Sequence, residues 1–231
     1  MENLSEVDIM TRTPLAQRTL PDYSRRQEWS NMISHIIGAA IGVGVLFIVI
    51  FHSEHRDVLS PLSGLIYAVS LIALYTVSSV YHGLRPSMGK KVMQVIDHCT
   101  IYFLIAGSYT PILISAMRPA YPTLAWIIFA AEWSLAAFAV VFTAIDHKKY
   151  GKLSMACYIG MGWFIILALK PTLEVIGKSG FLLLLLGGIS YTIGAVIYGL
   201  GKKRPVLHTV FHYFVLLGSI LQAAAILIYA L

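Results

Sequence analysis

The chain has 231 residues, of which 58% are hydrophobic and only 12% are charged. Soluble domains carry about 25% charged residues, so this composition excludes an ordinary soluble protein and indicates an integral membrane protein. The net charge of +6 does not indicate nucleic-acid binding, because the basic residues occur in short clusters between apolar runs rather than along one exposed face.

Apolar stretches of membrane-spanning length follow a polar N-terminal region. A helix needs roughly 20 mostly apolar residues to cross a hydrocarbon core about 30 Å thick. Residues 1–27 are too polar and form a predicted tail, and residues 28–231 form one predicted membrane domain. The predicted spans run approximately over 31–51, 59–82, 94–117, 122–144, 153–169, 180–200 and 206–230. The fold prediction is therefore an all-α bundle of seven transmembrane helices.

The basic residues are distributed unevenly between the two sides of this predicted bundle. Cytoplasmic loops are enriched in Lys and Arg. Thirteen of the 17 Lys and Arg residues lie in the tail and in the loops on its side of the membrane, and four lie on the other side. This predicts a cytoplasmic tail and an external C-terminus, in a multi-pass protein of the plasma membrane.

Four residues inside the predicted spans indicate how the helices pack. Gly38 and Gly42 have the small-xxx-small spacing of close helix contacts. Pro111 predicts a kink in the third span, because proline removes a backbone hydrogen bond and clashes with the preceding turn. Glu132 lies near the middle of the fourth span, where a bare carboxylate is costly, so it is expected to be buried and either protonated or paired. The sequence identifies no partner or role for it.

Histidines collect near the predicted cytoplasmic ends of several spans. His208 and His212 are four residues apart at the start of the last span, and residues at this spacing share a helix face about 5–6 Å apart. They can therefore bind one metal ion together. His82, at the end of the second span, provides a third imidazole at the same depth. Three histidines with one position left for water are typical of catalytic zinc. His98 and His35 are alternative third ligands.

Ser78 and Asp97 bring further polar groups to this depth. Ser78 lies one turn before His82, and Asp97 opens the third span. Both can hydrogen-bond a metal-bound water, and a carboxylate there can act as a general base. Asp97 and His98 are adjacent, and successive helical residues point about 100° apart, so both cannot face one centre equally.

Glu28, Asn31 and His35 share one face at the start of the first span. Two interpretations are open for them. They form either a network that supports the metal ligands or a polar cap at the N-terminus of the helix.

Several motifs resemble, in order, those of the haemolysin III proteins, the bacterial branch of the progestin and adiponectin receptor family. They are SSVYHGL, IDH followed by IAGSYTP, and LHTVFHYFV preceded by GKKRP, and the likeness covers about residues 28–222. The resemblance implies a seven-helix membrane protein with a cytoplasmic N-terminus. It also implies a zinc ion near the cytoplasmic side, with its ligands and neighbours at His82, His208, His212, Asp97 and Ser78. EWSN followed by SH matches the family's Glu, Asn and His positions at Glu28, Asn31 and His35.

The function expected from these residues is a zinc-dependent hydrolase of an amide or ester of a membrane lipid. The resemblance implies a ceramidase-like activity and a part in membrane-lipid homeostasis. Two alternatives are open: a non-enzymatic sensor or regulator of membrane state, with structural zinc joining the second and last spans, and a pore-forming cytolysin. Membrane lipids are the expected partners and nucleic acid is not. The lipid, the oligomeric state, the occurrence of catalysis and the choice of zinc over another divalent ion are not determined by the sequence.

Overall fold

The described part of the chain, in the computed structural model, comprises residues 12–52, 57–200 and 204–231. Its regular elements are all helical, as predicted, with no strand in these three ranges. Expectations for the start of the tail (1–11) and for two loops (53–56 and 201–203) lie outside the described residues. The longer helices are α1 (Arg25–His52), α2 (Leu59–Gly83), α3 (Met88–Pro111), α4 (Pro122–Asp146), α5 (Gly151–Gly162), α6 (Leu169–Leu200) and α7 (Pro205–Tyr229). The short ones are η2 (Leu15–Gln17), η3 (Ile112–Met117) and η4 (Phe164–Ala168).

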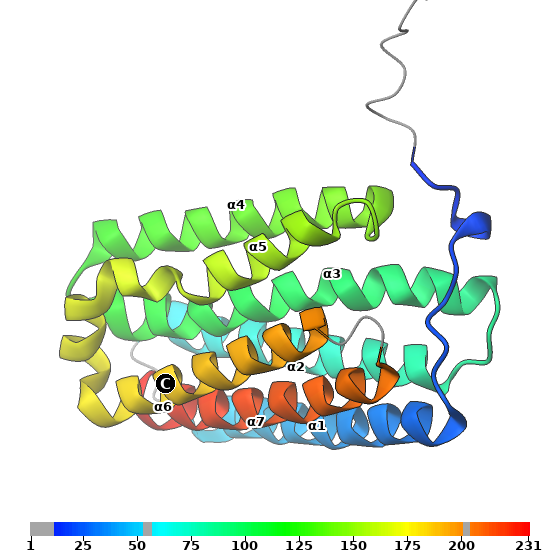
Figure 1. Cartoon of the computed structure of the whole chain (residues 1–231). Coiled ribbons are helices and arrows are strands. Elements are labelled where there is room, and N and C mark those ends of the chain that lie inside the picture. The colour runs from blue at the N-terminus through cyan, green and yellow to red at the C-terminus, as the bar shows by residue number, and fades with distance from the viewer. Residues whose placement is uncertain (1–11, 53–56, 201–203) are drawn as a thin grey trace, which may run out of the picture.

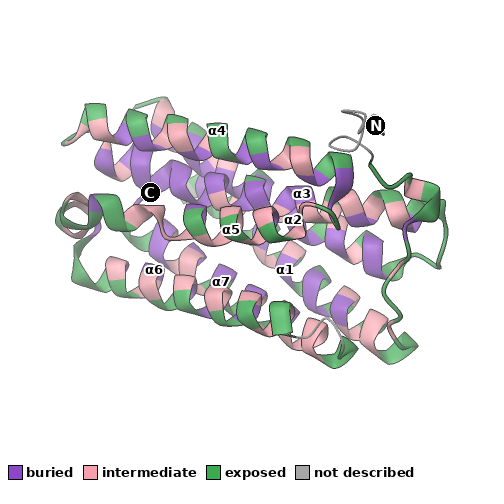
Figure 2. Ribbon diagram, turned by 45° about the horizontal axis from the view of Figure 1, so that its top comes forward, coloured by how far each residue is buried: buried purple, intermediate pink, exposed green. Residues whose placement is uncertain are grey.

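These helices lie side by side with roughly parallel axes (Figure 1). α1 packs on α2 and α7, α2 on α3, α3 on α4, and α6 on α7. Figure 2 shows that buried residues follow the inner faces of the helices and exposed residues follow the outer faces. Large apolar side chains are exposed on those outer faces, among them Phe47, Val69, Ile127 and Val141. Such a surface is typical of a bundle surrounded by lipid.

Within the described ranges, six helical stretches are long and apolar enough to cross a membrane. They are Arg25–Phe51, Leu59–Gly83, Met88–Met117, Pro122–Asp146, Gly151–Leu200 and Pro205–Tyr229. The predicted fifth and sixth spans both fall within Gly151–Leu200, a single stretch of 50 residues. Gly177 interrupts α6 there with φ 69° and ψ 174°, a conformation that glycine adopts without a steric penalty. Figure 1 shows the chain reversing direction between α5 and the C-terminal part of α6.

The helix backbone changes at Pro111. η3, which follows it directly, is π-helical, and the Arg118 N–H donates to the Leu113 carbonyl at 2.8 Å. Proline has no N–H and its ring clashes with the preceding turn, so it disfavours a regular α-helical ladder. The third predicted span therefore extends from α3 through η3.

α1 and α2 approach each other closely at two glycines of α1. A Cβ added at Gly38 would lie 2.4 Å from ring atoms of Tyr75, and one added at Gly42 would lie 2.9 Å from the Ile72 side chain. Tyr75 is fully buried, and its hydroxyl donates to Ser219 Oγ at 2.7 Å. The ring therefore cannot withdraw without losing a buried hydrogen bond, and the small-xxx-small spacing marks a contact between helices.

A Gly38→Ala variant is expected to be destabilised by about 1–3 kcal/mol, because the added methyl group overpacks the contact with Tyr75. Gly44→Ala is the matched control in the same helix, since nothing lies within 4 Å of its added Cβ. The free energy of unfolding of that control is expected to equal that of the wild type or to exceed it by up to about 1 kcal/mol, because alanine favours the helix more than glycine does. Thermal unfolding of both variants and the wild type in one detergent measures these effects. Equal melting temperatures for Gly38→Ala and the wild type would show that the α1–α2 contact is loose.

The described part of the N-terminal tail, residues 12–24, crosses one end of the bundle (Figure 1). Arg18 is buried, and its guanidinium donates to the Ile145 carbonyl at 2.6 Å. The Lys148 ammonium donates to the Thr19 carbonyl at 2.6 Å. These contacts hold the segment against the end of α4 and the turn that follows it.

Candidate metal centre

Three histidines from two helices meet at the end of the bundle that the N-terminal segment crosses. His82 lies in the last turn of α2, and His208 and His212 lie in the first turns of α7. One ring nitrogen from each lies within 4.8 Å of the others, so the group could hold a metal ion. His82 and His212 are buried and His208 is half-buried. The structure thus brings together the three residues that the sequence predicted as ligands.

The Nε2 atoms of His208 and His212 face each other, and Nε2 is the ring nitrogen of His82 that does not contact Glu28. His82 Nδ1 lies 2.6 Å from Glu28 Oε2, and His82 Nε2 has no hydrogen-bond partner among the described residues. His212 Nδ1 lies 2.6 Å from His35 Nε2, and His212 Nε2 lies 2.9 Å from His208 Nε2. Two nitrogens bound to one tetrahedral zinc ion, each at about 2.0–2.1 Å, would be about 3.3 Å apart. A buried nitrogen without a partner is costly, and a cation here would satisfy it, so the residues fit a metal ion.

Glu28, in the first turn of α1, connects His82 to a buried lysine. Its Oε1 accepts a hydrogen bond from Lys90 Nζ at 2.6 Å. Lys90 Nζ also donates to the Leu84 carbonyl at 2.9 Å. Asn31 Nδ2 lies 3.5 Å from His82 Nδ1. The polar face predicted on the first span therefore contacts the histidines.

The two alternative third ligands lie beside the group rather than in it. His35 packs its ring against Tyr75, with centroids 4.9 Å apart, and contacts His212 through Nε2. His98 donates from Nδ1 to the Gln94 carbonyl at 2.8 Å. Of the candidates, His82 is the one that joins His208 and His212.

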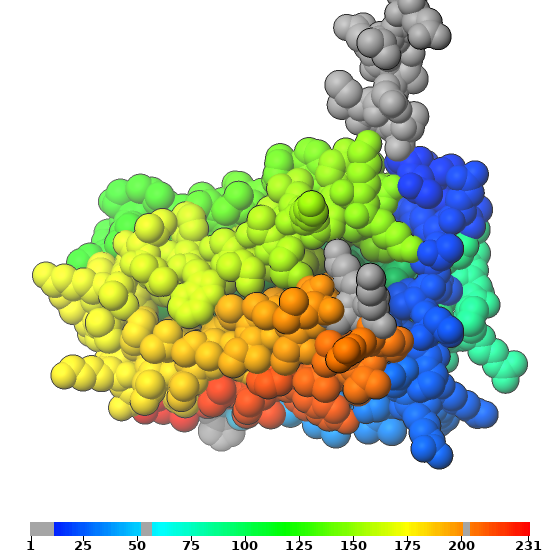
Figure 3. Space-filling model, viewed as in Figure 1, coloured from blue at the N-terminus to red at the C-terminus, as the bar shows by residue number. Residues whose placement is uncertain are grey.

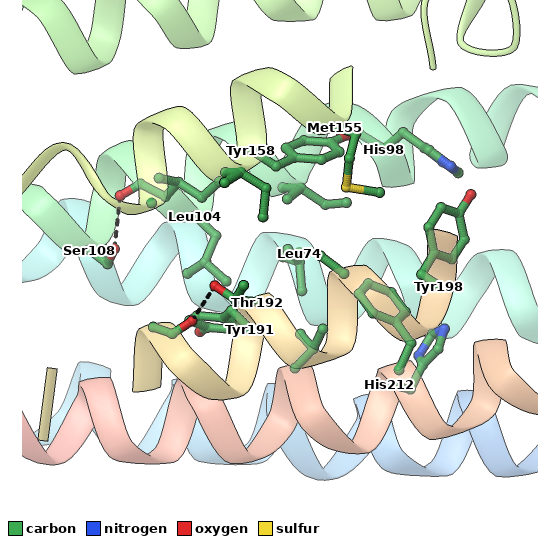
Figure 4. A pocket seen from close by; sticks show the side chains of 18 of the residues that line it. Leu74, His98, Leu104, Ser108, Met155, Tyr158, Tyr191, Thr192, Tyr198 and His212 are labelled. Atoms are coloured by element: carbon green, nitrogen blue, oxygen red, sulfur yellow. Dashed lines mark hydrogen bonds between the residues drawn. The ribbon is translucent and has the colours of Figure 1, made fainter. Parts of the chain in front are cut away.

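A largely apolar cavity of about 150 Å³ extends from the histidines into the bundle between α2, α3, α5, α6 and α7. The surface is hollowed between α5 and α6 (Figure 3). Figure 4 shows a polar end formed by His98, Tyr198 and His212, with Ser108 at the opposite end and Leu74 and Leu104 between them. The lining of the cavity is thus mostly apolar and includes polar groups next to the histidines.

Asp97 and Ser78 line this cavity together with His208 and His212. Ser78 belongs to α2 and Asp97 to α3, and these two helices pack on each other. The predicted serine and aspartate therefore lie on adjacent helices in the lining of the cavity.

One family model, described as Haemolysin-III related, matches residues 23–223, which include all three histidines. The chain belongs to the haemolysin-III related family. It is 38% identical over 207 residues to Hemolysin-3 of Bacillus cereus, covering 89% of this chain and 93% of the relative. It is 36% identical over 208 residues to the Hemolysin-3 homolog of Bacillus subtilis (strain 168), covering 90% and 96%. It is also 29% identical over 207 residues to the human Monocyte to macrophage differentiation factor, covering 85% and 78%.

These matches confirm the resemblance that the sequence motifs indicated. Together with the six helical stretches of membrane-spanning length, they identify this haemolysin-III related chain as a multi-pass membrane protein.

Tyr23, a residue that sequence reasoning missed, covers the candidate metal centre of this haemolysin-III related chain. The Tyr23 ring stacks on His208, with centroids 4.8 Å apart and an interplanar angle of 16°, and it lies 5.9 Å from the His82 ring. Burial raises the pKa of the Tyr23 hydroxyl well above its usual value, so this side chain is neutral. Tyr23 lies in the polar tail, and no local pattern marks it as a residue that covers a site.

Lys90 was also missed, because it appears in the sequence as one of two loop lysines. The Ser87 side chain accepts a hydrogen bond from the Lys90 N–H and caps α3, so the helix begins six residues before the predicted start of this span. Lys90 then shares a helix face with Gln94 and Asp97, at i, i+4 and i+7. This i, i+4, i+7 spacing is the sequence signal that could have identified Lys90 as an inward-facing residue.

Glu132 lies outside the metal centre. It is fully buried, as expected, and neither carboxyl oxygen has a hydrogen-bond partner within the described ranges.

Proposed function

We propose that this haemolysin-III related protein is a zinc-dependent hydrolase that cleaves an amide or ester of a membrane lipid and so contributes to lipid homeostasis in the plasma membrane. The observation that supports this proposal is the group of three histidine ring nitrogens within 4.8 Å of one another. Two of these residues, His208 and His212, line a largely apolar cavity inside a bundle of membrane-spanning length. When bound to three histidines, zinc supplies a Lewis acid that activates water near neutral pH.

Asp97 is the proposed general base and acid. Asp97 lines the cavity together with His208 and Ser78, and the Ser78 hydroxyl is the proposed group that orients its carboxylate. The carboxylate takes a proton from the attacking water as the new C–O bond forms at the lipid carbonyl. It then returns this proton to the leaving amine or alcohol as the C–N or C–O bond breaks, so that the products are a fatty acid and the remaining amine or alcohol part of the lipid.

The cavity favours a substrate with an acyl chain. Its walls between the histidines and Ser108 carry Leu74, Leu104 and other apolar side chains. Transfer of a hydrocarbon chain into such a space is favourable, and the chain excludes water from the reacting groups. The hollow between α5 and α6 is the proposed entrance from the bilayer (Figure 3).

We further propose that the chain crosses the membrane seven times with its N-terminus in the cytoplasm. The reversal around Gly177 supports two passes within Gly151–Leu200. Figure 1 shows the starts of α1, α3, α5 and α7 at one end of the bundle. The charge count from the sequence, with thirteen of the 17 basic residues in the tail and the loops predicted on its side, would then put the histidines near the cytoplasmic leaflet.

Release of fatty acid from a defined lipid tests the proposed activity. Purified full-length protein loaded with zinc is mixed with micelles that contain a ceramide or an ester lipid of the same acyl chain. Release is expected with zinc, is expected to stop after chelation, and is expected to return when zinc is restored. His147→Ala is the control, since this residue lies outside both the ligand group and the lining of the cavity and should retain activity.

Two results would reject the hydrolase. A protein that carries one zinc per chain and releases no fatty acid from either lipid would favour a structural ion that joins α2 to α7. Conductance across planar bilayers containing the protein, with no turnover, would favour the pore-forming alternative.

A further inference from the structure

Lys90 is a buried charged residue beside the metal centre that the proposed chemistry does not use. Its side chain is 3% exposed, and lysine is almost never so buried unless it is paired. Its ammonium makes two hydrogen bonds, to Glu28 Oε1 at 2.6 Å and to the Leu84 carbonyl at 2.9 Å. It also lies 5.0 Å from the centre of the Tyr81 ring.

We propose that Lys90 is a positioning residue that orients His82 through Glu28. Lys90 occupies Oε1 of the carboxylate, which leaves Oε2 to accept the hydrogen bond from His82 Nδ1 at 2.6 Å. That bond keeps the proton on Nδ1 and directs Nε2, which has no partner among the described residues, toward the other two histidines. Glu28 alone could rotate about its side-chain bonds, whereas a carboxylate bonded at both oxygens is fixed.

The bond from Lys90 to the Leu84 carbonyl adds a second constraint. Leu84 is two residues after His82, and its N–H closes α2 by donating to the Val80 carbonyl at 3.1 Å. Lys90 therefore bonds both to the carboxylate that orients His82 and to the chain segment that carries it. The Lys90 ammonium thus connects α3 to α1 and to the end of α2 beside His82.

A purely stabilising ion pair is a weaker explanation of this arrangement. Removing two charges from water costs several kcal/mol per ion, and their attraction often does no more than offset this cost. An apolar pair would serve packing equally well. The Lys90–Glu28 ion pair, however, supplies a fixed hydrogen-bond acceptor for the His82 imidazole, which an apolar pair cannot do.

The neighbouring lysine provides a matched control. Lys91 follows Lys90 in α3, but its ammonium donates to the Ala16 carbonyl at the exposed surface, at 2.6 Å. The cap at Ser87 determines which of the two faces inward. Substitutions at the two positions change the same charge in the same helical turn and differ in the link to Glu28.

Zinc affinity of the purified full-length protein, measured by competition with a chromophoric chelator, tests the inference, which rests on the proposed metal site. Lys90→Gln is expected to weaken zinc binding about 10–100-fold, the range typical of residues that support metal ligands. Lys91→Gln is expected to stay within about twofold of the wild type, since Lys91 has no contact with Glu28 in the structure. Lys90→Met, which keeps the apolar stem, serves as the second variant if Lys90→Gln does not purify in folded form.

A double-mutant cycle separates positioning from stabilisation. If Lys90 acts through Glu28, Lys90→Gln should weaken zinc binding in the wild type and have little further effect in a Glu28→Gln background. The cobalt-substituted Lys90 variant should also have an altered visible spectrum, which reports ligand geometry. Equal zinc affinities for the substitutions at 90 and 91, or additive losses in the cycle, would overturn the inference. A wild-type protein that binds no zinc would instead refute the proposed metal site itself.

Discussion

A His212→Ala variant is expected to purify with almost no zinc under conditions in which the wild type carries one ion per chain. His212 lies at the centre of the group, because its Nε2 faces His208 and its Nδ1 contacts His35. Removing one of three ligands should weaken binding by more than the roughly 100-fold that is typical of losing a supporting residue. Elemental analysis, with zinc normalised to protein concentration, measures this directly.

His98→Ala is the control for that loss, since it removes an imidazole at nearly the same depth but outside the ligand group. It is expected to keep the full zinc content. Equal zinc in the His212→Ala and wild-type proteins would place any bound ion elsewhere in the chain.

An Asp97→Asn variant is expected to bind zinc as the wild type does but to hydrolyse lipid about 10²–10⁴-fold more slowly, the contribution typical of a general base. Asparagine has nearly the same size and shape as aspartate, so the shape of the cavity should be preserved. An amide cannot take the proton from water, however. The first-order rate of fatty-acid release at saturating lipid, with zinc content measured on the same samples, checks both parts.

Ser78→Ala provides the comparison for Asp97→Asn. It removes the hydroxyl that is proposed to orient the carboxylate but leaves the proton acceptor in place, so its rate should fall less. Unchanged turnover in Asp97→Asn would remove Asp97 from the proposed mechanism, and parallel loss of zinc would make it a structural residue.

The meeting of the three histidines could be predicted from helical spacing and from the thickness of the membrane. Helical spacing places His208 and His212 on one face, and the thickness of the membrane brings the ends of distant spans to a common depth. His82 and Asp97 therefore fall into the same layer as His208 and His212. In the structure, Asp97, His208 and His212 line the cavity, and His82 lies close to the two histidines of α7.

The residues that support the centre could not be predicted in this way. The burial of Lys90 depends on where the cap at Ser87 starts α3 and on a carboxylate supplied by another helix. Tyr23 is held over His208 by tertiary contacts of a polar segment. Neither property is carried by local composition, which indicates solvent exposure for both.

The break predicted between the fifth and sixth spans also differs from the structure. A cluster of charged and turn-forming residues at 170–180 indicated a loop, but this region is helical except at Gly177. Polar residues near a membrane surface do not prevent helix formation, because backbone hydrogen bonding within the helix satisfies the chain there. One glycine with positive φ is enough to redirect it.

The ligands of the ion can be measured directly by X-ray absorption at the zinc edge on the purified wild-type protein. Three imidazole nitrogens at about 2.0–2.1 Å and one further light-atom ligand are predicted from the positions of His82, His208 and His212. Sulfur in the coordination shell, or fewer than three imidazoles around the ion, would contradict the central claim that these three side chains bind one metal.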